Sequence, residues 1–567
     1  MKISSLYAKI VNWFYARFIG FGKPATGFKL QPEPRSIGNF AKGLQLGAGN
    51  IMFAGHLIEA KGTILWDIAS PDKAFSEETH GFGWLDDLAA VGDSRSRKIA
   101  QDWVQSWIDN FGKGVGPGWT PEITGRRLIR WIHHGVMLLQ GLDRNRSENF
   151  FKSLARQTLF LSRRWHTTSP GISRFEALTG LICSGLALEG MEKYVKPATI
   201  ALSKECQNQI DPSGGIPTRN PEELLEVFML LTWVSLALRE SGWNPSPSHI
   251  GALERIAPTL RMLRHLDGSL ARFHGGGAGI EGWLDQALVE SGNKKVPEEK
   301  KLFMGFSRMS ADGVSIIVDS ALPPKEFASA SGHASTLAIE MVTDRYPLIV
   351  NCGSGVSFGE EWSRAGRATS SHSGLCISNS SSSNLSFPFT HGGKLIQTLI
   401  DGPSEVSHRF GRTTEGTQLE IAHDGYIHQN GVKYSRKVFL VSDGTKLSVE
   451  EILVSNGEKQ RQIFDTAYEN SNLQGINCHL RLHLHPDVIA ELDLGGEAVS
   501  LLTKRKDIWV FRKEGPGEIS IESSVYFEKG RLHPRPSKQI VLSLFLRDYT
   551  TQIAWTLEKA QVNRNIY

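Results

Sequence analysis

Histidines and arginines gather in one stretch of the chain, residues 331–380, with a spacing that suits proton transfer beside a bound anion. His333 stands at the head of one alternating apolar segment and His372 at the head of a second. Arg364 and Arg367 lie between them, after a tight Asn-Cys-Gly turn. A histidine can remove or deliver a proton, and an arginine can neutralise the carboxylate beside the reacting carbon. We therefore expect these side chains to converge at strand ends.

A second set of candidates precedes this stretch. Arg219 and Asn220 come directly before a predicted helix that begins at Pro221. The free backbone N–H groups of a helix N-terminus favour anions, so this pair is our preferred carboxylate-binding pair. The alternative is that Asn220 caps the helix, with proline at its first position.

One amphipathic segment carries a further group of cations. Arg126 and His133 lie seven residues apart, as do Arg127 and His134, so each pair shares a helix face. We expect substrate contact from Arg126, Arg127 and His134, and a solvated or structural role is the alternative.

The sequence shows two different hydrophobic periodicities, which indicate the helices and strands that position these residues. From about residue 85 to 290, apolar residues recur at helical spacing between short Gly, Pro or Asn breaks. From about residue 305 onward, short segments alternate apolar and polar residues between turns. We predict an N-terminal amphipathic segment (1–40), a domain of helical hairpins arranged in a ring or solenoid (41–302) and an antiparallel β-sandwich (303–567).

Composition narrows the function classes. A chain of 567 residues is too long for a single hydrophobic core, so two or more domains are expected. Its net charge of +4 argues against a dedicated nucleic-acid-binding protein. The sequence contains no run of about 18 apolar residues, so no transmembrane helix is predicted. Lys9 and Arg17 interrupt the apolar N-terminal stretch, which predicts a mature amphipathic helix rather than a signal peptide. The five cysteines show no CxxC spacing, which disfavours a disulfide framework. Oligomeric state stays open.

Several motifs occur in an order typical of one family. They are HGFGWLDDLAA (80–90), WTPEITGRRLIRWIHH (119–134), GGIPTRNPEELLE (214–226), GHASTLAIEM, RATSSHSGLCISN and HLRLHLHPDV. Together the chain resembles the heparinase II/III family of bacterial polysaccharide lyases. The resemblance implies an incomplete α/α toroid packed on a β-sandwich, with a carbohydrate cleft between them. It also implies β-elimination of uronate polymers: a base removes the C5 proton and an acid protonates the leaving oxygen.

The chain departs from the family pattern where chemistry is expected. His333 matches the second histidine of an HxHAD pattern, but Ser331 and Ser335 replace its first histidine and its aspartate. Asn351 stands where the family has an aspartate, and Ser373 replaces an asparagine after His372.

The resemblance also bears on cofactor and proton donor. It implies either no cofactor or a zinc ion at His333. His483 and His485 alternate in HLRLHLHPDV and so share one strand face, and one of them, with His483 preferred, would complete the zinc site with His333. Tyr194, the only tyrosine of the helical half after residue 15, lies outside any segment resembling the family's tyrosine motif. Tyr426 and Tyr434 would substitute only if they reached the cleft.

The leading hypothesis is a lyase acting on an acidic polysaccharide in the envelope or periplasm, a cytoplasmic location staying open. His333, His372, Arg219 and Asn220 would be catalytic, and the substrate-binding set would be Arg126, Arg127, His134, Arg364 and Arg367. The rival hypothesis is a non-catalytic carbohydrate-binding or envelope-assembly protein on the same fold. A third alternative, hydrolysis by paired carboxylates, needs two acids about 5–10 Å apart.

Overall fold

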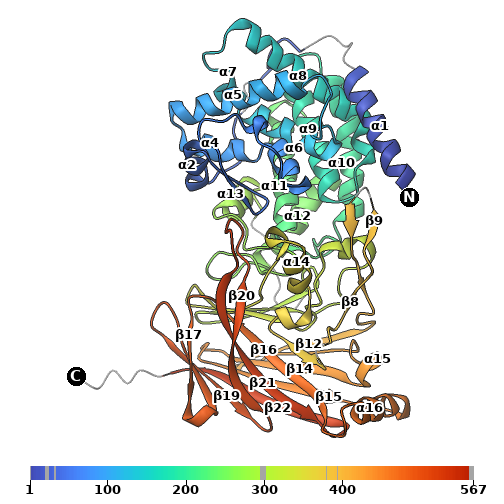
Figure 1. Cartoon of the computed structure of the whole chain (residues 1–567), viewed down its shortest axis with the longest axis vertical. Helices are drawn as coiled ribbons and strands as arrows, with labels where there is room; N and C mark the ends of the chain where they lie inside the picture. The colour runs from blue at the N-terminus through green and yellow to red at the C-terminus, as the bar shows by residue number, and fades with distance from the viewer. Residues whose placement is uncertain are drawn as a thin grey trace, which may run out of the picture.

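The computed structural model describes residues 2–18, 25–30, 33–293, 302–378, 380–391 and 394–560. A helical N-terminal half lies over a C-terminal half built of β-strands (Figure 1). The last helix of the first half ends at Glu290 and the first strand of the second begins at Phe306. The predicted toroid followed by a sandwich is confirmed, while residues 294–301 between the two lie outside the described residues.

The helical half consists of amphipathic helices with well-defined starts. Six of the described helices, α2, α3, α5, α8, α11 and α12, follow a side chain that accepts a hydrogen bond from a first-turn N–H group. These side chains are Asn39, Asp72, Asp93, Asp143, Asn220 and Ser246. The helices are α1 (Lys2–Phe18), α2 (Phe40–Ala48), α3 (Lys73–Gly81), α4 (Trp84–Val91), α5 (Ser94–Phe111), α6 (Pro121–His133), α7 (Gly135–Leu139), α8 (Arg144–Arg164), α9 (Ile172–Ala187), α10 (Val195–Gln209), α11 (Pro221–Glu240), α12 (Pro247–Met262) and α13 (Trp283–Glu290). A short hairpin, β1 (Asn50–Phe53) and β2 (His56–Glu59), interrupts them.

Helices α6 and α9 cross unusually closely. A Cβ atom at Gly180 would lie 2.7 Å from Cα of Gly125, and one at Gly125 would lie 2.5 Å from the Glu176 carbonyl oxygen. Both helices therefore need glycine at the crossing. The contact sets Arg126 on α6 directly beside the side chain of Glu176 on α9.

Two antiparallel sheets form the C-terminal half. The first sheet runs in the order β12 (Val406–Arg412), β13 (Gly416–His423), β14 (Lys433–Val441), β15 (Lys446–Val454), β22 (Thr550–Lys559), β19 (Ile508–Glu514), β18 (Ala498–Leu502) and β17 (Ile489–Asp493). The second runs β20 (Glu518–Tyr526), β21 (Arg535–Leu546), β16 (Ile476–Leu484), β6 (Tyr346–Val350), β5 (Ile339–Thr343), β4 (Val314–Asp319) and β3 (Phe306–Ala311), with β7 (Leu375–Ile377) also paired to β16. Strands β14 and β15 alternate buried and half-buried residues, as a sheet with one covered face requires.

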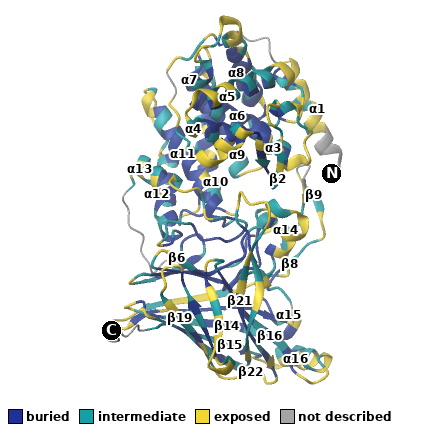
Figure 2. Cartoon of the chain, turned by 60° about the vertical axis from the view of Figure 1, so that its left-hand side comes forward, coloured by how far each residue is buried: buried dark blue, intermediate teal, exposed yellow. Residues whose placement is uncertain are grey.

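The remaining strands and helices lie outside the two sheets. They are β8 (Asn384–Leu385), β9 (Phe389–His391), β10 (Lys394–Ile396), β11 (Leu399–Ile400), α14 (Glu360–Gly366), α15 (Ile427–Asn430) and α16 (Glu458–Asn470). The hairpin of β9 and β10 reaches toward the helical half (Figure 1). Buried residues concentrate inside each half, while loops and outer faces are exposed (Figure 2).

A buried ion pair crosses the sandwich interior. Arg436 and Glu451 are both fully buried, with Nη2 of the arginine 2.9 Å from Oε1 of the glutamate. Tyr434 and Trp555 also donate hydrogen bonds to this carboxylate. Nη1 of Arg436 donates in turn to the carbonyl oxygen of Leu337, at 2.6 Å. The pair is thus fully hydrogen-bonded, as a buried charge must be.

The N-terminal stretch forms the predicted amphipathic helix, α1, which packs against α8. Trp13 and Phe14 on this helix are exposed. None of the helices in the described part of the chain combines the length and apolarity that crossing a bilayer requires.

Candidate functional site

Asp319, at the end of β4, links the two domains. It is fully buried, and its Oδ1 lies 2.5 Å from Nη2 of Arg219 in the helical domain. Oδ2 accepts a hydrogen bond from Ser335 at 2.7 Å and lies 3.3 Å from Nε2 of His274. Burial alone would raise the pKa of Asp319, but the charge of Arg219 and the hydrogen bond from His274 hold it well below its usual range.

Two histidines continue this network into the loops of the sandwich. The backbone N–H of His333 donates to Nδ1 of His274 at 3.2 Å, and Nδ1 of His333 lies 3.0 Å from Nε2 of His372. Nδ1 of His372 lies 2.8 Å from the carbonyl oxygen of Ala368. Of the side chains expected to converge, His333 and His372 therefore lie in contact with each other.

The hydrogen bonds fix the tautomers of the pair. A carbonyl oxygen only accepts, so Nδ1 of His372 carries a proton and its Nε2 must accept from Nδ1 of His333. Nε2 of His333 then holds a lone pair, and it has no hydrogen-bond partner among the described residues. Burial, with His372 and His274 nearby, lowers the pKa of His333 well below its usual range. His333 is thus a neutral imidazole, able in principle to take a proton at Nε2.

Arg219 is occupied by contacts within the protein. Its Nε donates to the carbonyl oxygen of Met304 at 3.0 Å and its Nη1 to that of Leu322 at 2.7 Å. Its guanidinium carbon lies 4.7 Å from the centre of the Phe306 ring. The side chain therefore fastens the helical domain to the sandwich and leaves no donor facing a ligand.

Asn220 caps α11 as the structural alternative predicted. Its Oδ1 accepts from the backbone N–H groups of Glu222 and Glu223, at 3.0 and 3.2 Å. Its amide NH₂ has no hydrogen-bond partner in the part of the chain that the structure describes.

The substrate-binding candidates of α6 have separate environments. Arg127 is fully buried, with its guanidinium carbon 4.0 Å from the centre of the Trp107 ring, and burial lowers its pKa. His134 is also buried, with Nε2 2.8 Å from Oδ1 of Asp86. Arg126 alone lines a cavity, where its Nε lies 2.5 Å from Oε1 of Glu176. Helical spacing alone did not reveal which of the two adjacent arginines is accessible.

The arginines between the two histidines also differ. Arg364 on α14 is exposed and lies 3.6 Å from Glu360. Arg367 is buried and donates to the carbonyl oxygens of Gly332 and Ser329, both at 2.8 Å. Arg367 thereby holds the loop that carries His333, which makes it a positioning residue.

The donors proposed for zinc do not come together. Both ring nitrogens of His483 have other partners: Nδ1 lies 2.8 Å from Oγ of Ser524, and Nε2 lies 2.9 Å from the carbonyl oxygen of Ser370. Nδ1 of His333 faces His372 instead. Among the described residues, no three His, Cys, Asp or Glu side chains converge as metal ligands. The donor set therefore does not fit a zinc site of the usual kind.

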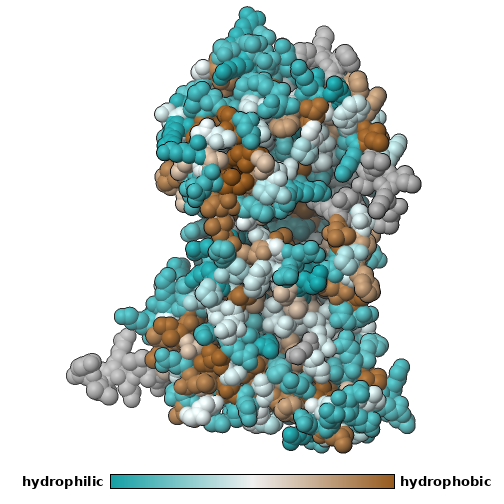
Figure 3. All heavy atoms as spheres, in the orientation of Figure 1, coloured by the Kyte–Doolittle hydropathy of each residue, from teal (hydrophilic) through white to brown (hydrophobic). Residues whose placement is uncertain are grey.

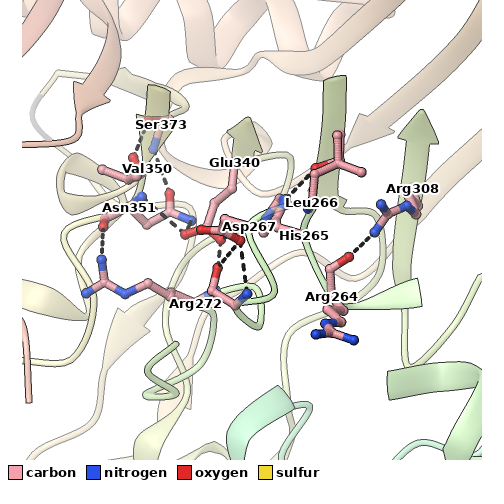
Figure 4. A network of polar contacts seen from close by, with 12 residues as sticks. Arg264, His265, Leu266, Asp267, Arg272, Arg308, Glu340, Val350, Asn351 and Ser373 are labelled. Carbon is pink, nitrogen blue, oxygen red and sulfur yellow. Dashed lines mark hydrogen bonds and ion pairs between the residues drawn. The ribbon is translucent and has the colours of Figure 1, made fainter. Parts of the chain in front are cut away.

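Asn351 belongs to a separate polar network (Figure 4). Its Nδ2 donates to Oε1 of Glu340 at 3.1 Å, and its Oδ1 accepts from the backbone N–H of Ser373 at 2.9 Å. Oε2 of Glu340 accepts from the backbone N–H of Arg272 at 2.8 Å. A neutral amide is required here because an aspartate would face another carboxylate.

The two sandwich tyrosines lie in the core. Tyr426 donates to the carbonyl oxygen of Leu375 at 2.6 Å, and Tyr434 donates to Glu451 at 2.7 Å. Both are fully buried, and burial raises their pKa well above the usual value. Neither hydroxyl is placed to serve a cleft.

Sequence reasoning missed His274, Asp319 and Glu340. His274 stands before a glycine run, HGGGAG, that does not match a phosphate loop. Its φ of +49° is a strained conformation for a residue with a side chain. A histidine before consecutive glycines was the available signal, but its partner Asp319 lies 45 residues away across the domain interface.

A cavity of about 290 Å³ lies in the helical domain. Its polar lining is mostly acidic, with Glu77, Glu78, Glu176 and Glu226 facing Arg126 and Arg130. Its apolar lining includes Trp233 and Trp283. Separately, the surface is hollowed at the waist between the two domains (Figure 3).

Comparison with known proteins identifies the fold and the C-terminal domain. Residues 299–556 match the family model described as Heparinase II/III-like, C-terminal. FtsZ-localized protein C of Caulobacter vibrioides is 28% identical over 508 residues, covering 88% of this chain and 84% of that protein.

Solved structures of polysaccharide lyases have a fold similar to that of this chain. A crystal structure of heparinase III superposes with a TM-score of 0.70 at 13% identity, covering 98% of this chain and 89% of that one. A mutant of the heparan sulfate lyase HepC from Pedobacter heparinus superposes with a TM-score of 0.59 at 12% identity, with the same coverage. Residues 299–556 therefore form a domain that matches the Heparinase II/III-like, C-terminal model, and the fold of the whole chain is similar to that of heparinase III.

Proposed function

We propose that this protein is a non-catalytic member of the heparinase fold that binds a glycan of the bacterial cell envelope during its assembly. The 28% identical relative is named for localisation with FtsZ, and we extend that localisation to this chain. The proposal makes the chain an assembly protein rather than a lyase, on the scaffold that lyases use.

The observation that carries the proposal is that Arg219 is committed to internal contacts. β-Elimination needs a cation or strong donor on the substrate carboxylate and an acid for the leaving oxygen. Arg219, the best-placed cation, is neutralised by Asp319 and bonded to backbone carbonyls. Neither Tyr426 nor Tyr434 can supply that acid, since both are buried in the sandwich.

The charge of the cavity in the helical domain supports the same conclusion. Four glutamates line it against two arginines, and Arg126 is already paired with Glu176. A uronate polymer would bring further carboxylates toward a surface with an excess of negative charge, which electrostatics disfavours.

The second candidate function is the lyase reaction itself on an acidic polysaccharide, and the tautomer of His333 favours it. A neutral imidazole with an unpaired Nε2 is able to accept a proton, although its lowered pKa makes it a weak base, and the NH₂ group of Asn220 could contact a carboxylate. In this candidate His333 would remove the C5 proton, and the acid would be water or a group of the substrate.

Two measurements on the purified full chain separate the candidates. Absorbance at 232 nm is followed with heparan sulfate, chondroitin, alginate and bacterial exopolysaccharides, with and without zinc. Binding of the same polymers and of isolated cell-wall material is measured by co-sedimentation. We expect saturable binding without a rise in absorbance. A rise that His333→Ala abolishes would establish the lyase and refute our proposal.

Localisation is tested in the cell. A fluorescent fusion of the full chain should coincide with the FtsZ ring, and depletion of FtsZ should disperse it. A fusion that stays evenly distributed while FtsZ rings are intact would contradict the localisation that we propose.

A further inference from the structure

We propose that the cavity of the helical domain binds an amino sugar whose nitrogen is unsubstituted, and that its glutamates receive the ammonium group. The inference rests on the proposed glycan-binding function and specifies the class of glycan. It replaces the expected acidic polymer by a cationic one.

The cavity has more carboxylates than cations to neutralise them. Nε of Arg126 lies 2.5 Å from Oε1 of Glu176, and Nε of Arg130 lies 3.3 Å from Oδ2 of Asp86, which is buried. Both guanidinium groups are thus engaged. Glu226 has neither a hydrogen bond nor an ion pair within the described chain. The nearby ammonium group of Lys529 is itself paired with Glu222, so the carboxylates of the lining still outnumber the cations that act on them.

Glu176 provides the independent indication of a ligand. It is 8% exposed and lines the cavity from α9. Its Oε1 accepts from Arg126, but its Oε2 is buried with no hydrogen-bond partner among the described residues. A buried carboxylate oxygen without a donor is costly, and nearly all such atoms in folded proteins are paired. An ammonium group in the cavity would provide the missing donor.

The apolar lining determines what should carry that ammonium group. Trp233 from α11 and Trp283 from α13 line the cavity, together with Met229 and Leu230. Nε1 of Trp283 donates to the carbonyl oxygen of Ile37 at 2.8 Å, which fixes that ring. Flat aromatic rings pack on the apolar faces of sugar rings and attract cations. A volume of about 290 Å³ suits one sugar unit rather than the narrow tip of a lysine side chain.

The titration of the neighbouring carboxylates agrees with this reading. Burial, and then the charge of Glu222, raises the pKa of Glu226 to about 7. Burial also raises the pKa of Glu78. A bound cation would offset the repulsion between these neighbouring carboxylates, whereas a uronate would add to it.

The test compares two oligosaccharides that differ only at nitrogen. Isothermal titration of the full chain at pH 7 uses the tetramer of β-1,4-linked glucosamine and the matching N-acetylglucosamine tetramer. The amine is then mostly charged if its pKa resembles that of an α-amino group, about 7.7–8.0. We expect the amino tetramer to bind at least tenfold more tightly, because acetylation removes the charge. A tetramer of a uronate and N-acetyl-lysine methylamide serve as further arms.

Two variants locate the site, and one controls for charge. Glu226→Gln and Glu176→Gln should each weaken binding of the amino tetramer about tenfold, as expected for loss of a charged hydrogen bond. Glu240→Gln removes the same charge from the far end of α11 and should leave binding unchanged. Equal effects of all three variants would show a general electrostatic attraction and refute the site.

The comparison of tetramers with the wild-type chain needs no variant to fold. Equal binding of the amino and acetylated tetramers, or tighter binding of the uronate or of the lysine derivative, would overturn the inference. If cell-wall material still bound in that case, the glycan-binding function would stand and only the ammonium site would fall. If the amino tetramer bound but a polymer produced absorbance at 232 nm, the non-catalytic function would fall and the site would stand.

Discussion

Replacing Asn351 by aspartate tests the reasoning about the polar network most directly. The substitution converts the Nδ2 donor into an oxygen about 3.1 Å from Oε1 of Glu340, in a fully buried place. Two unit charges at that separation repel by about 5 kcal/mol at an effective dielectric constant of about 20. His265 and Arg272 hold the pKa of Glu340 below its usual value against the effect of burial, so Glu340 stays ionised.

Protonation of the new aspartate limits the loss of stability. An aspartate with an unfolded pKa of about 3.9 costs about 4 kcal/mol to protonate at pH 7 and about 1.5 kcal/mol at pH 5. Once protonated, it can donate to Glu340 as the amide did. We therefore expect N351D to be destabilised by about 4 kcal/mol at pH 7 and by about 1.5 kcal/mol at pH 5. The penalty grows with pH because the folded pKa of this group is raised above the unfolded one.

The assay is urea unfolding of wild type and variant at pH 5, 6 and 7, followed by circular dichroism. Because the protein has two domains, the transition that loses β-structure is the one compared. N351A is the control: it removes the same hydrogen bonds but adds no titrating group, so its penalty should not change with pH. An aspartate variant with a pH-independent penalty, or with wild-type stability at pH 7, would refute the arrangement described for Glu340.

Three further predictions concern the interface and the core. R219M should lower the free energy of unfolding by about 3–5 kcal/mol, because it leaves the buried carboxylate of Asp319 without its cation; urea unfolding measures this, and adding D319N should recover most of the loss if the pairing is as described. G180A should cost about 1–3 kcal/mol, because the new methyl group collides with Gly125 on α6; the thermal midpoint reports it, and an unchanged midpoint would contradict the close crossing. Burial lowers the pKa of His372 to about 4, so its contribution to stability is present above the unfolded pKa of about 6.5 and is lost as the pH falls toward 4. H372N should therefore reduce the pH dependence of the free energy of unfolding between pH 6.5 and 4 by about one bound proton, which urea midpoints at several pH values measure. An unaltered slope would show that His372 titrates normally.

The division of the chain into helical and β halves follows from sequence because its cause is local. Apolar residues recur about every 3.6 residues in the helices of one half and every 2 residues in the strands of the other, which reflects the face of each element that is covered. The proximity of His333 and His372 was also predictable, since both head strands of one sheet region. The pairing of Arg219 was not, because its carboxylate partner, Asp319, lies 100 residues away and across a domain boundary.

Adjacent residues on one helix show the same limit. Arg126 and Arg127 are equivalent in sequence, yet one lines a cavity and the other lies under Trp107 in the core. Their fates depend on how closely α9 approaches α6, which the glycines at the crossing decide. Likewise, the sequence suggests only that Asn351 replaces a metal-binding aspartate, and the structure shows that its amide donates a hydrogen bond to the carboxylate of Glu340.

The cation in the sandwich interior has a consequence for the motion of the histidine loops. Arg436 donates to the carbonyl oxygens of both Leu337 and Ser373, which follow His333 and His372 by four residues and one residue. Loops usually open in small local fluctuations, independently of the domain beneath them. Here one buried guanidinium ties both loops to the centre of the sheets. Their amide hydrogens should therefore exchange with solvent as slowly as those of the core strands, and only when the whole sandwich opens.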